Sequence, residues 1–180
     1  MNDFRKIEIS GHYKVNVVKG AKFSVEIEAT PDDHKLLSVI NRNGVLDIGY
    51  LRTTSQNYPI EVNIVMPELD AFSVTGTLQR GKITDFKGED LFVLIDGSAN
   101  IKVEDCNYGE LELELNGFGK IDALKSKAKN ASVTLSGTGI ILVNAAELLN
   151  AEVSGTGTVK YSGSPRLNTS NSGVGSIKHI

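Results

Sequence analysis

The chain has 180 residues, of which 40% are hydrophobic and 23% charged, with a formal net charge of −3 and one cysteine. This composition is typical of one medium or two small globular domains, and the acidic balance argues against nucleic acid as a partner, since binding a phosphate backbone needs a basic face. A single cysteine also excludes an internal disulfide and a multi-cysteine zinc or iron–sulfur site.

The first third of the sequence, residues 1–70, predicts short β-strands at irregular spacing. Asn43-Gly44 is typical of a hairpin turn between residues 38–40 and 45–48, and the one helix candidate, residues 31–37, is long enough for a turn or two. We expect this region to form an antiparallel or mixed sheet that packs on, or caps, the segment that follows. Period-two alternation marks strands at residues 7–9, 13–18, 23–27, 46–48 and 60–66.

From residue 74 onward a short phrase ending in glycine recurs at intervals of 18 to 21 residues. In five of the six copies a small residue stands two positions after this glycine, and Ile or Val stands four positions after it. The first copy departs from the pattern because Arg80 occupies the aliphatic position, and the register recovers only at residues 81–83. This departure predicts an irregular first coil. The recurring glycines are Gly76, Gly97, Gly117, Gly137, Gly155 and Gly173.

The alternation on either side of each glycine predicts two short strands joined at a glycine corner. A unit of about 20 residues cannot close a core alone, so it has to stack on copies of itself. An up-and-down barrel or a β-sandwich is the alternative, but aliphatic ladders at a near-constant interval favour a β-solenoid. We therefore predict an all-β protein in which residues 71–180 form about six short parallel coils. Because no Pro-, Gly- and Ser-rich linker separates them from residues 1–70, we expect one continuous body.

The residue types that usually carry chemistry are sparse and scattered. His12, His34 and His179 lie far apart without metal-ligand spacing, and Cys106 has acidic neighbours, which favours a buried structural thiol. The Ser-Gly-x-Gly segments lead into strands rather than helices, so they are corners and not phosphate-binding loops. We expect no cofactor and no metal.

Candidate binding residues come from the outward-facing positions. The position before each corner glycine forms a ladder that includes Asp96, Asn116, Ser136 and Ser154. The apolar Phe92 and Leu94 also fall in the outward register. They are therefore either covered by an N-terminal segment or form an exposed apolar patch suited to a partner.

Acidic residues raise the question of glycan cleavage, which needs two carboxyl groups at a definite separation. Only Asp96 in the ladder is an acid. Other acids in the middle coils could form an acidic patch, but charged side chains on an outer sheet face need no functional explanation. Those acids are Glu104, Asp105, Glu112, Glu114 and Asp122.

Three further features carry a family resemblance: the repeated glycine phrase, the Pro67-Glu68-Leu69 lead-in and the closing segment 161–165. Together with Ile-Ser-Gly and Tyr-Lys-Val-Asn-Val near the N-terminus, they resemble the putative auto-transporter adhesin, head GIN domain family. The resemblance implies a right-handed β-solenoid with an N-terminal β region, export from the cytoplasm and an adhesin-like role. The phrase is structural, so no catalytic residue is carried over. Asn171 departs from the phrase in the last copy, where capping or fraying is expected.

We therefore expect a noncatalytic, extracytoplasmic module of the cell envelope, periplasm or medium that binds a glycan or a cell-surface protein through Ser, Thr and Asn side chains. A polysaccharide-degrading enzyme is the first alternative, opposed by the absence of tryptophan for sugar stacking. A structural element is the second, with homo-oligomers formed at an exposed edge or at Phe92 and Leu94. Residues 1–6 lack an apolar signal core and no stretch reaches 18 apolar residues, so we expect neither an export signal nor a membrane span in this sequence.

Overall fold

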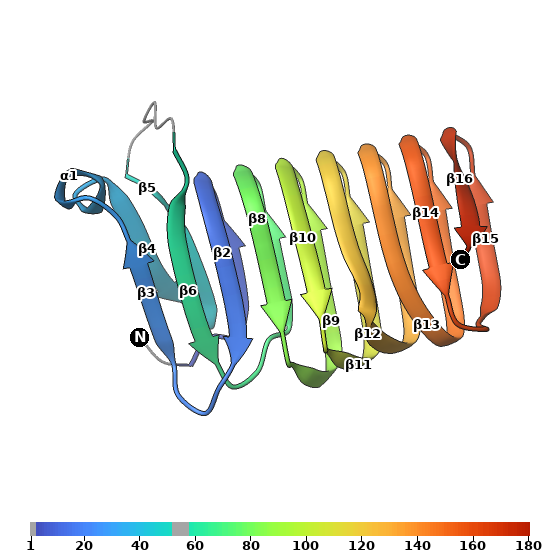
Figure 1. The fold of residues 1–180 in the computed structure, drawn as a ribbon, viewed down its shortest axis with the longest axis horizontal. Helices are drawn as coiled ribbons and strands as arrows, with labels where there is room; N and C mark the ends of the chain where they lie inside the picture. Colours follow the sequence, from blue (N-terminus) through green and yellow to red (C-terminus); the bar gives the residue numbers. More distant parts are fainter. Residues whose placement is uncertain (1–2, 52–57) are drawn as a thin grey trace.

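The protein is an all-β solenoid whose coils form two packed sheets (Figure 1). The computed structural model describes residues 3–51 and 58–180. The front sheet contains β3 (Ser24–Glu28), β6 (Ile60–Met66), β2 (His12–Lys19), β8 (Thr77–Thr84), β10 (Ser98–Glu104), β14 (Thr156–Ser162) and β16 (Val174–His179). The back sheet contains β4 (Leu37–Arg42), β5 (Val45–Tyr50), β1 (Lys6–Ile9), β7 (Ala71–Val74), β9 (Lys87–Ile95), β11 (Asn107–Leu115) and β15 (Arg166–Asn171).

Two long strands, β12 (Phe118–Leu135) and β13 (Thr138–Val153), pass from the front sheet to the back sheet. Their first parts, residues 118–123 and 138–144, pair with front strands, whereas residues 127–135 and 148–153 pair with back strands. The expected helical turn is present as α1 (Pro31–His34), which Thr30 caps by accepting a hydrogen bond from the amide of Asp33.

Each coil supplies one strand to each sheet, and successive coils pair in parallel with equivalent repeat positions aligned. In the front sheet this register forms a single apolar ladder of Ile101, Ile121, Ile141, Val159 and Ile177. All but the last of these side chains are buried, and they join one core cluster between the sheets. The predicted β-solenoid with glycine corners is therefore confirmed.

The corner glycines are required because successive coils touch through their backbones. A Cβ atom added at Gly137 would overlap the carbonyl oxygen of Gly117 in the preceding coil. At Gly139 a Cβ would overlap the carbonyl oxygen of Gly119, and the backbone there has φ +154°, which L side chains rarely adopt. Close approach thus excludes side chains at both positions.

The irregular first coil is also confirmed. Where β8 pairs with β10, the register shifts between Ala99 and Ile101, and where β8 pairs with β2 it shifts between Tyr13 and Lys14. The extra residue makes a β-bulge at Gln79-Arg80, which explains why the repeat phrase recovers at Gly81.

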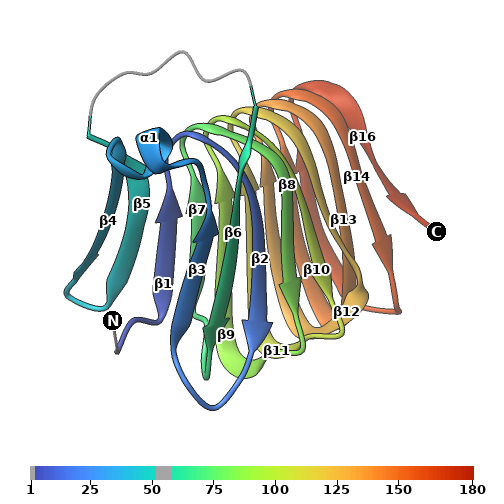
Figure 2. The ribbon, with the colours of Figure 1, turned by 60° about the vertical axis from the view of Figure 1, so that its left-hand side comes forward.

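The order of the N-terminal strands in space differs from their order in the chain. β1 lies between β5 and β7, and β2 lies between β6 and β8, so the first two strands form an interior coil. Their connection, residues 10–11, is stacked against the corner at Gly76, and the segment Ile9-Ser10-Gly11 is similar to the repeat phrase. The chain then reaches the end of the solenoid, where β3 and β4 pair antiparallel to β6 and β5 (Figure 2).

Residues 1–70 and residues 71–180 pair in the same sheets and contribute to one core. Ile9 in β1 pairs with Val74 in β7, and buried side chains of both regions belong to the same core cluster. On this basis we propose that residues 1–70 and 71–180 fold as one continuous body. Among the described residues, no helix is both long and apolar enough to cross a membrane.

Candidate functional site

The outer surface of the back sheet carries polar side chains in straight rows across the coils. The first row joins Ser132, Asn150 and Asn168, because parallel pairing places them on adjacent strands at the same register. The second row joins Thr134, Glu152 and Ser170 in the same way. Outward side chains alternate with the buried Val133 and Ala151, so both rows face solvent.

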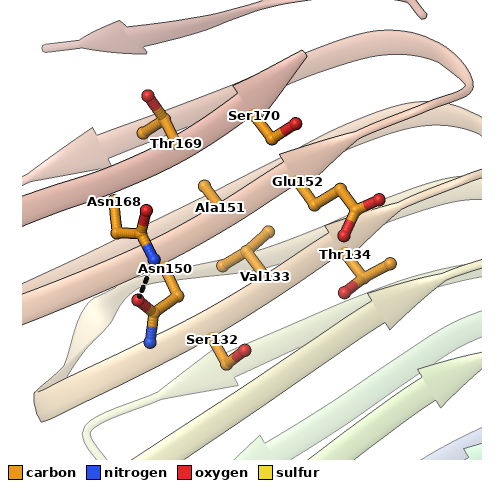
Figure 3. A pocket seen from close by; sticks show the side chains of 9 residues that line it. All are labelled: Ser132, Val133, Thr134, Asn150, Ala151, Glu152, Asn168, Thr169 and Ser170. Carbon is orange, nitrogen blue, oxygen red and sulfur yellow. Dashed lines mark hydrogen bonds between the residues drawn. The ribbon is translucent and has the colours of Figure 1, made fainter. Parts of the chain in front are cut away.

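These two rows line a shallow groove with a volume of about 160 Å³ (Figure 3). Within it, Asn168 donates a hydrogen bond from Nδ2 to Oδ1 of Asn150 at 3.2 Å. Hydroxyls and amides both donate and accept hydrogen bonds, while the carboxylate of Glu152 only accepts. The groove is smaller than a typical cavity for a small molecule and suits contact along a surface.

The ladder residues predicted from the sequence form the neighbouring row, at the glycine corners. Asp96, Asn116, Ser136 and Ser154 are exposed, and each backbone amide donates to a carbonyl of the preceding coil at 2.8 to 3.1 Å. The side chain of Ser136 donates to Oδ1 of Asn116 at 2.6 Å. Ser136 and Ser154 directly follow the ends of β12 and β13, which carry groove residues, whereas Asp96 and Asn116 belong to earlier coils. Their part in binding stays a prediction.

The strand alternation identifies Ser132 and Thr134 as outward-facing but does not single out the groove. A signal for it exists in the repeat. Ser132, Asn150 and Asn168 each stand five positions before a corner glycine, and the second row stands three positions before it. Aligning the copies on their glycines would have found both rows.

Phe92 and Leu94 face outward on β9 and are half-buried. Phe92 contributes to a second cavity, of about 380 Å³, whose other walls include Arg5 and Asp90. The N-terminal segment thus flanks this aromatic side chain. Arg5 is held there by Asp70, with Nε to Oδ2 at 2.7 Å, and this contact raises the pKa of Arg5.

The acids of the middle coils do not form one patch. Glu112 and Glu114 lie on the back sheet, whereas Glu104 and Asp122 lie on the front sheet and Asp105 occupies a corner with φ +57°. This separation arises because β10 and the first part of β12 belong to the opposite sheet.

Glu104 forms ion pairs with two lysines of this chain. Its carboxylate meets Lys82 at 3.0 Å and Lys125 at 3.3 Å, and these bonds lower its pKa. Asp122 likewise meets Lys120 at 2.8 Å.

Cys106 is buried, as predicted, and burial raises the pKa of its thiol. Its backbone amide donates a hydrogen bond to Oγ of Ser126 at 3.1 Å, within the corner opposite the glycines. In the part of the chain that the structure describes, no three His, Cys, Asp or Glu side chains gather in a way that would hold a metal ion.

Comparisons with known proteins agree with this fold. The family model described as putative auto-transporter adhesin, head GIN domain, matches residues 3–165, so the chain belongs to this family. No curated protein matches the sequence.

Three solved structures share the fold. A putative adhesin from Bacteroides fragilis is 22% identical with a TM-score of 0.79, covering 99% of this chain and 93% of that one. A putative adhesin from Parabacteroides merdae is 16% identical with a TM-score of 0.54, covering 100% and 93%. A putative lipid binding protein from Parabacteroides distasonis is 19% identical with a TM-score of 0.53, covering 100% and 94%. At these identities the likeness concerns the fold alone.

Proposed function

From its membership in the head GIN domain family and the polar rows of its back sheet, we propose that the chain is a noncatalytic, adhesin-like module that binds a glycan along the groove. The observation that carries this proposal is the alignment of Ser132, Asn150 and Asn168 beside Thr134, Glu152 and Ser170. The family supports an adhesin-like role and a place outside the cytoplasm.

The chemistry of the groove matches that of a carbohydrate. Sugar hydroxyls donate and accept hydrogen bonds, as do the Ser, Thr and Asn side chains of the two rows. Adjacent strands lie about 4.8 Å apart, so a chain of sugars crossing the coils meets a new pair of polar groups at each strand. Each hydrogen bond contributes about 1 kcal/mol or less net, and an extended contact adds several of them.

The test is retention of labelled glycans by the pure protein, followed by sizing of both the complex and the glycan. The double variant Asn150→Ala/Asn168→Ala removes the central amides of the groove. Asn100→Ala/Asn107→Ala is the matched control, because it removes two exposed amides that lie outside the groove. We expect one or more glycans to be retained intact, with retention lost in the groove variant and kept in the control.

Two results would contradict the proposal. Retention of no glycan would exclude a carbohydrate ligand and direct attention to a protein surface. Shortened glycans would contradict a noncatalytic role and point to Glu114 and Glu152, which stand two strands apart in one row, about 9.5 Å by strand spacing. Separations of about 6.5 to 9.5 Å are typical of inverting glycosidases.

A further inference from the structure

The solenoid separates charge between its two sheets although the chain as a whole is nearly neutral. From β8 to β16, the front sheet carries six cationic side chains and two acidic ones, Glu104 and Asp122. Over the same coils the back sheet carries six acidic side chains, among them Glu110, Glu112 and Glu114 on β11, and four cationic ones. The cationic side chains of the front sheet are Arg80, Lys82, Lys102, Lys120, Lys160 and Lys178.

Four of these lysines stand in one row, because parallel pairing aligns six adjacent strands at the same register. The row reads Lys82, Lys102, Asp122, Leu142, Lys160 and Lys178. At about 4.8 Å per strand it extends for about 24 Å across the front sheet. In the repeat these positions recur five residues after a corner glycine, apart from Lys82, which the β-bulge displaces by one.

Among the described residues, the two acids of these front strands leave three of the four lysines of the row without an ion pair. Glu104 is engaged by Lys82 and Lys125, and Asp122 by Lys120. Across residues 3–51 and 58–180, Lys102, Lys160 and Lys178 take part in no ion pair. Their ammonium groups are therefore available to an anionic partner.

Large apolar side chains project from the same face. Phe118 is 63% exposed, Ile140 40% and Val174 78%. Ile140 lies in the outward row next to the lysine row, where it aligns with Lys120. Phe118 and Val174 lie in the following outward row, where Phe118 aligns with Thr138. An aromatic and two aliphatic side chains exposed among lysines are typical of a surface that enters the boundary between lipid headgroups and acyl chains.

We propose that the front sheet docks on an anionic lipid bilayer. Lys102, Lys160 and Lys178 contact the phosphate headgroups, and Phe118 and Ile140 enter the interfacial layer. Such docking turns the acidic back sheet and its polar groove away from the membrane. The proposal rests on the front sheet alone and does not depend on a glycan ligand.

A single tryptophan tests the orientation, since the chain has none of its own. Phe118→Trp places the probe on the front sheet, and Phe92→Trp places a matched probe on the back sheet. With vesicles of phosphatidylglycerol and phosphatidylcholine, emission of the front-sheet probe should shift to shorter wavelength and be quenched by lipids that carry a nitroxide on the acyl chain. Emission of the back-sheet probe should stay unchanged.

Charge variants test the lysine row by vesicle sedimentation. Lys102→Gln/Lys160→Gln/Lys178→Gln should lower the partition coefficient about a hundredfold, at roughly fivefold per lysine. The matched variant Lys87→Gln/Lys127→Gln/Lys129→Gln on the back sheet should bind as the unmodified chain does. Binding should weaken as added salt screens the charges, and should be absent on vesicles of phosphatidylcholine alone.

The proposal is overturned if the unmodified chain fails to sediment with anionic vesicles at low salt. It is equally overturned if the back-sheet variant loses as much binding as the front-sheet variant, or if both tryptophan probes respond alike. Retention of soluble polygalacturonate without vesicle binding would overturn it too, and would indicate that the partner of the front sheet is an acidic polysaccharide rather than a membrane.

Discussion

Replacing Gly137 with alanine tests the backbone contact on which the stacking of the coils depends. The added Cβ would overlap the carbonyl oxygen of Gly117 and lie 2.5 Å from the carbonyl oxygen of Asn116. Ordinary contacts begin at 3.4 Å, so relief of the Asn116 contact alone requires the two coils to move apart by about 1 Å, and relief of the closer Gly117 contact requires more. This movement stretches two hydrogen bonds, from the amide of Gly137 to Leu115 at 2.8 Å and from that of Thr138 to Gly117 at 2.9 Å.

Loss of two backbone hydrogen bonds at about 1 kcal/mol each, with the packing lost beside them, predicts a destabilisation of about 2 to 4 kcal/mol. Urea denaturation followed by circular dichroism measures it. With a slope of about 2 kcal/mol per molar urea, the midpoint should fall by about 1 to 2 M. Ser136→Ala in the same corner removes one exposed hydroxyl and should change stability by less than about 0.5 kcal/mol. A Gly137→Ala midpoint equal to that of the unmodified chain would refute the contact.

Three further outcomes are expected. Lys82 and Lys125 lower the folded-state pKa of Glu104, so its charge stabilises the fold above the unfolded-state pKa, and this stability is lost as pH falls through the lowered value. Glu104→Gln should therefore lower the urea midpoint at pH 7 and leave it unchanged in strong acid. An equal effect at both pH values would contradict the ion pairs. The thiol of Cys106 should react with Ellman's reagent only after unfolding in urea, since it is buried, whereas rapid reaction of the folded chain would refute that burial. A fragment of residues 71–180 lacks β1 and β2, which pair with β7 and β8, so it exposes unpaired strand edges and should aggregate, as size-exclusion chromatography would show. A folded monomer would instead show that the two regions are separable.

The repeat made most of the solenoid predictable. Glycines at a near-constant interval, with aliphatic side chains at fixed offsets, specify both the corner and the register, because a stacked coil has to place equivalent positions side by side. The irregularity at Arg80 was visible because it interrupts these fixed offsets. Asn43-Gly44, with φ of 52° and 79°, was equally informative, since few residue pairs adopt that hairpin turn.

The position of the first coil was not predictable from the sequence. Ile9-Ser10-Gly11 resembles the repeat, but nothing local indicates that β1 inserts between β5 and β7. That choice depends on which edges remain unpaired once all strands have formed, so it is a property of the whole sheet rather than of any segment.

The charge of the front sheet was hidden by the net charge of the chain. An overall value of −3 argues against a basic surface, yet it averages two faces of opposite sign. Lys102, Lys160 and Lys178 share one offset from the corner glycines, and reading the repeat by column would have placed them together. The contacts that neutralise Glu104 and Asp122 depend on side-chain conformations, which the sequence alone does not specify.

The central claim is that the two sheets face different partners, and amide chemical shifts in a ¹H–¹⁵N spectrum test it most directly. A retained glycan should shift the amides of Ser132, Asn150 and Asn168, whereas anionic lipid bicelles should perturb those of Lys102, Ile140 and Lys160. Perturbation of the same sheet by both ligands would contradict the assignment of one surface to each partner.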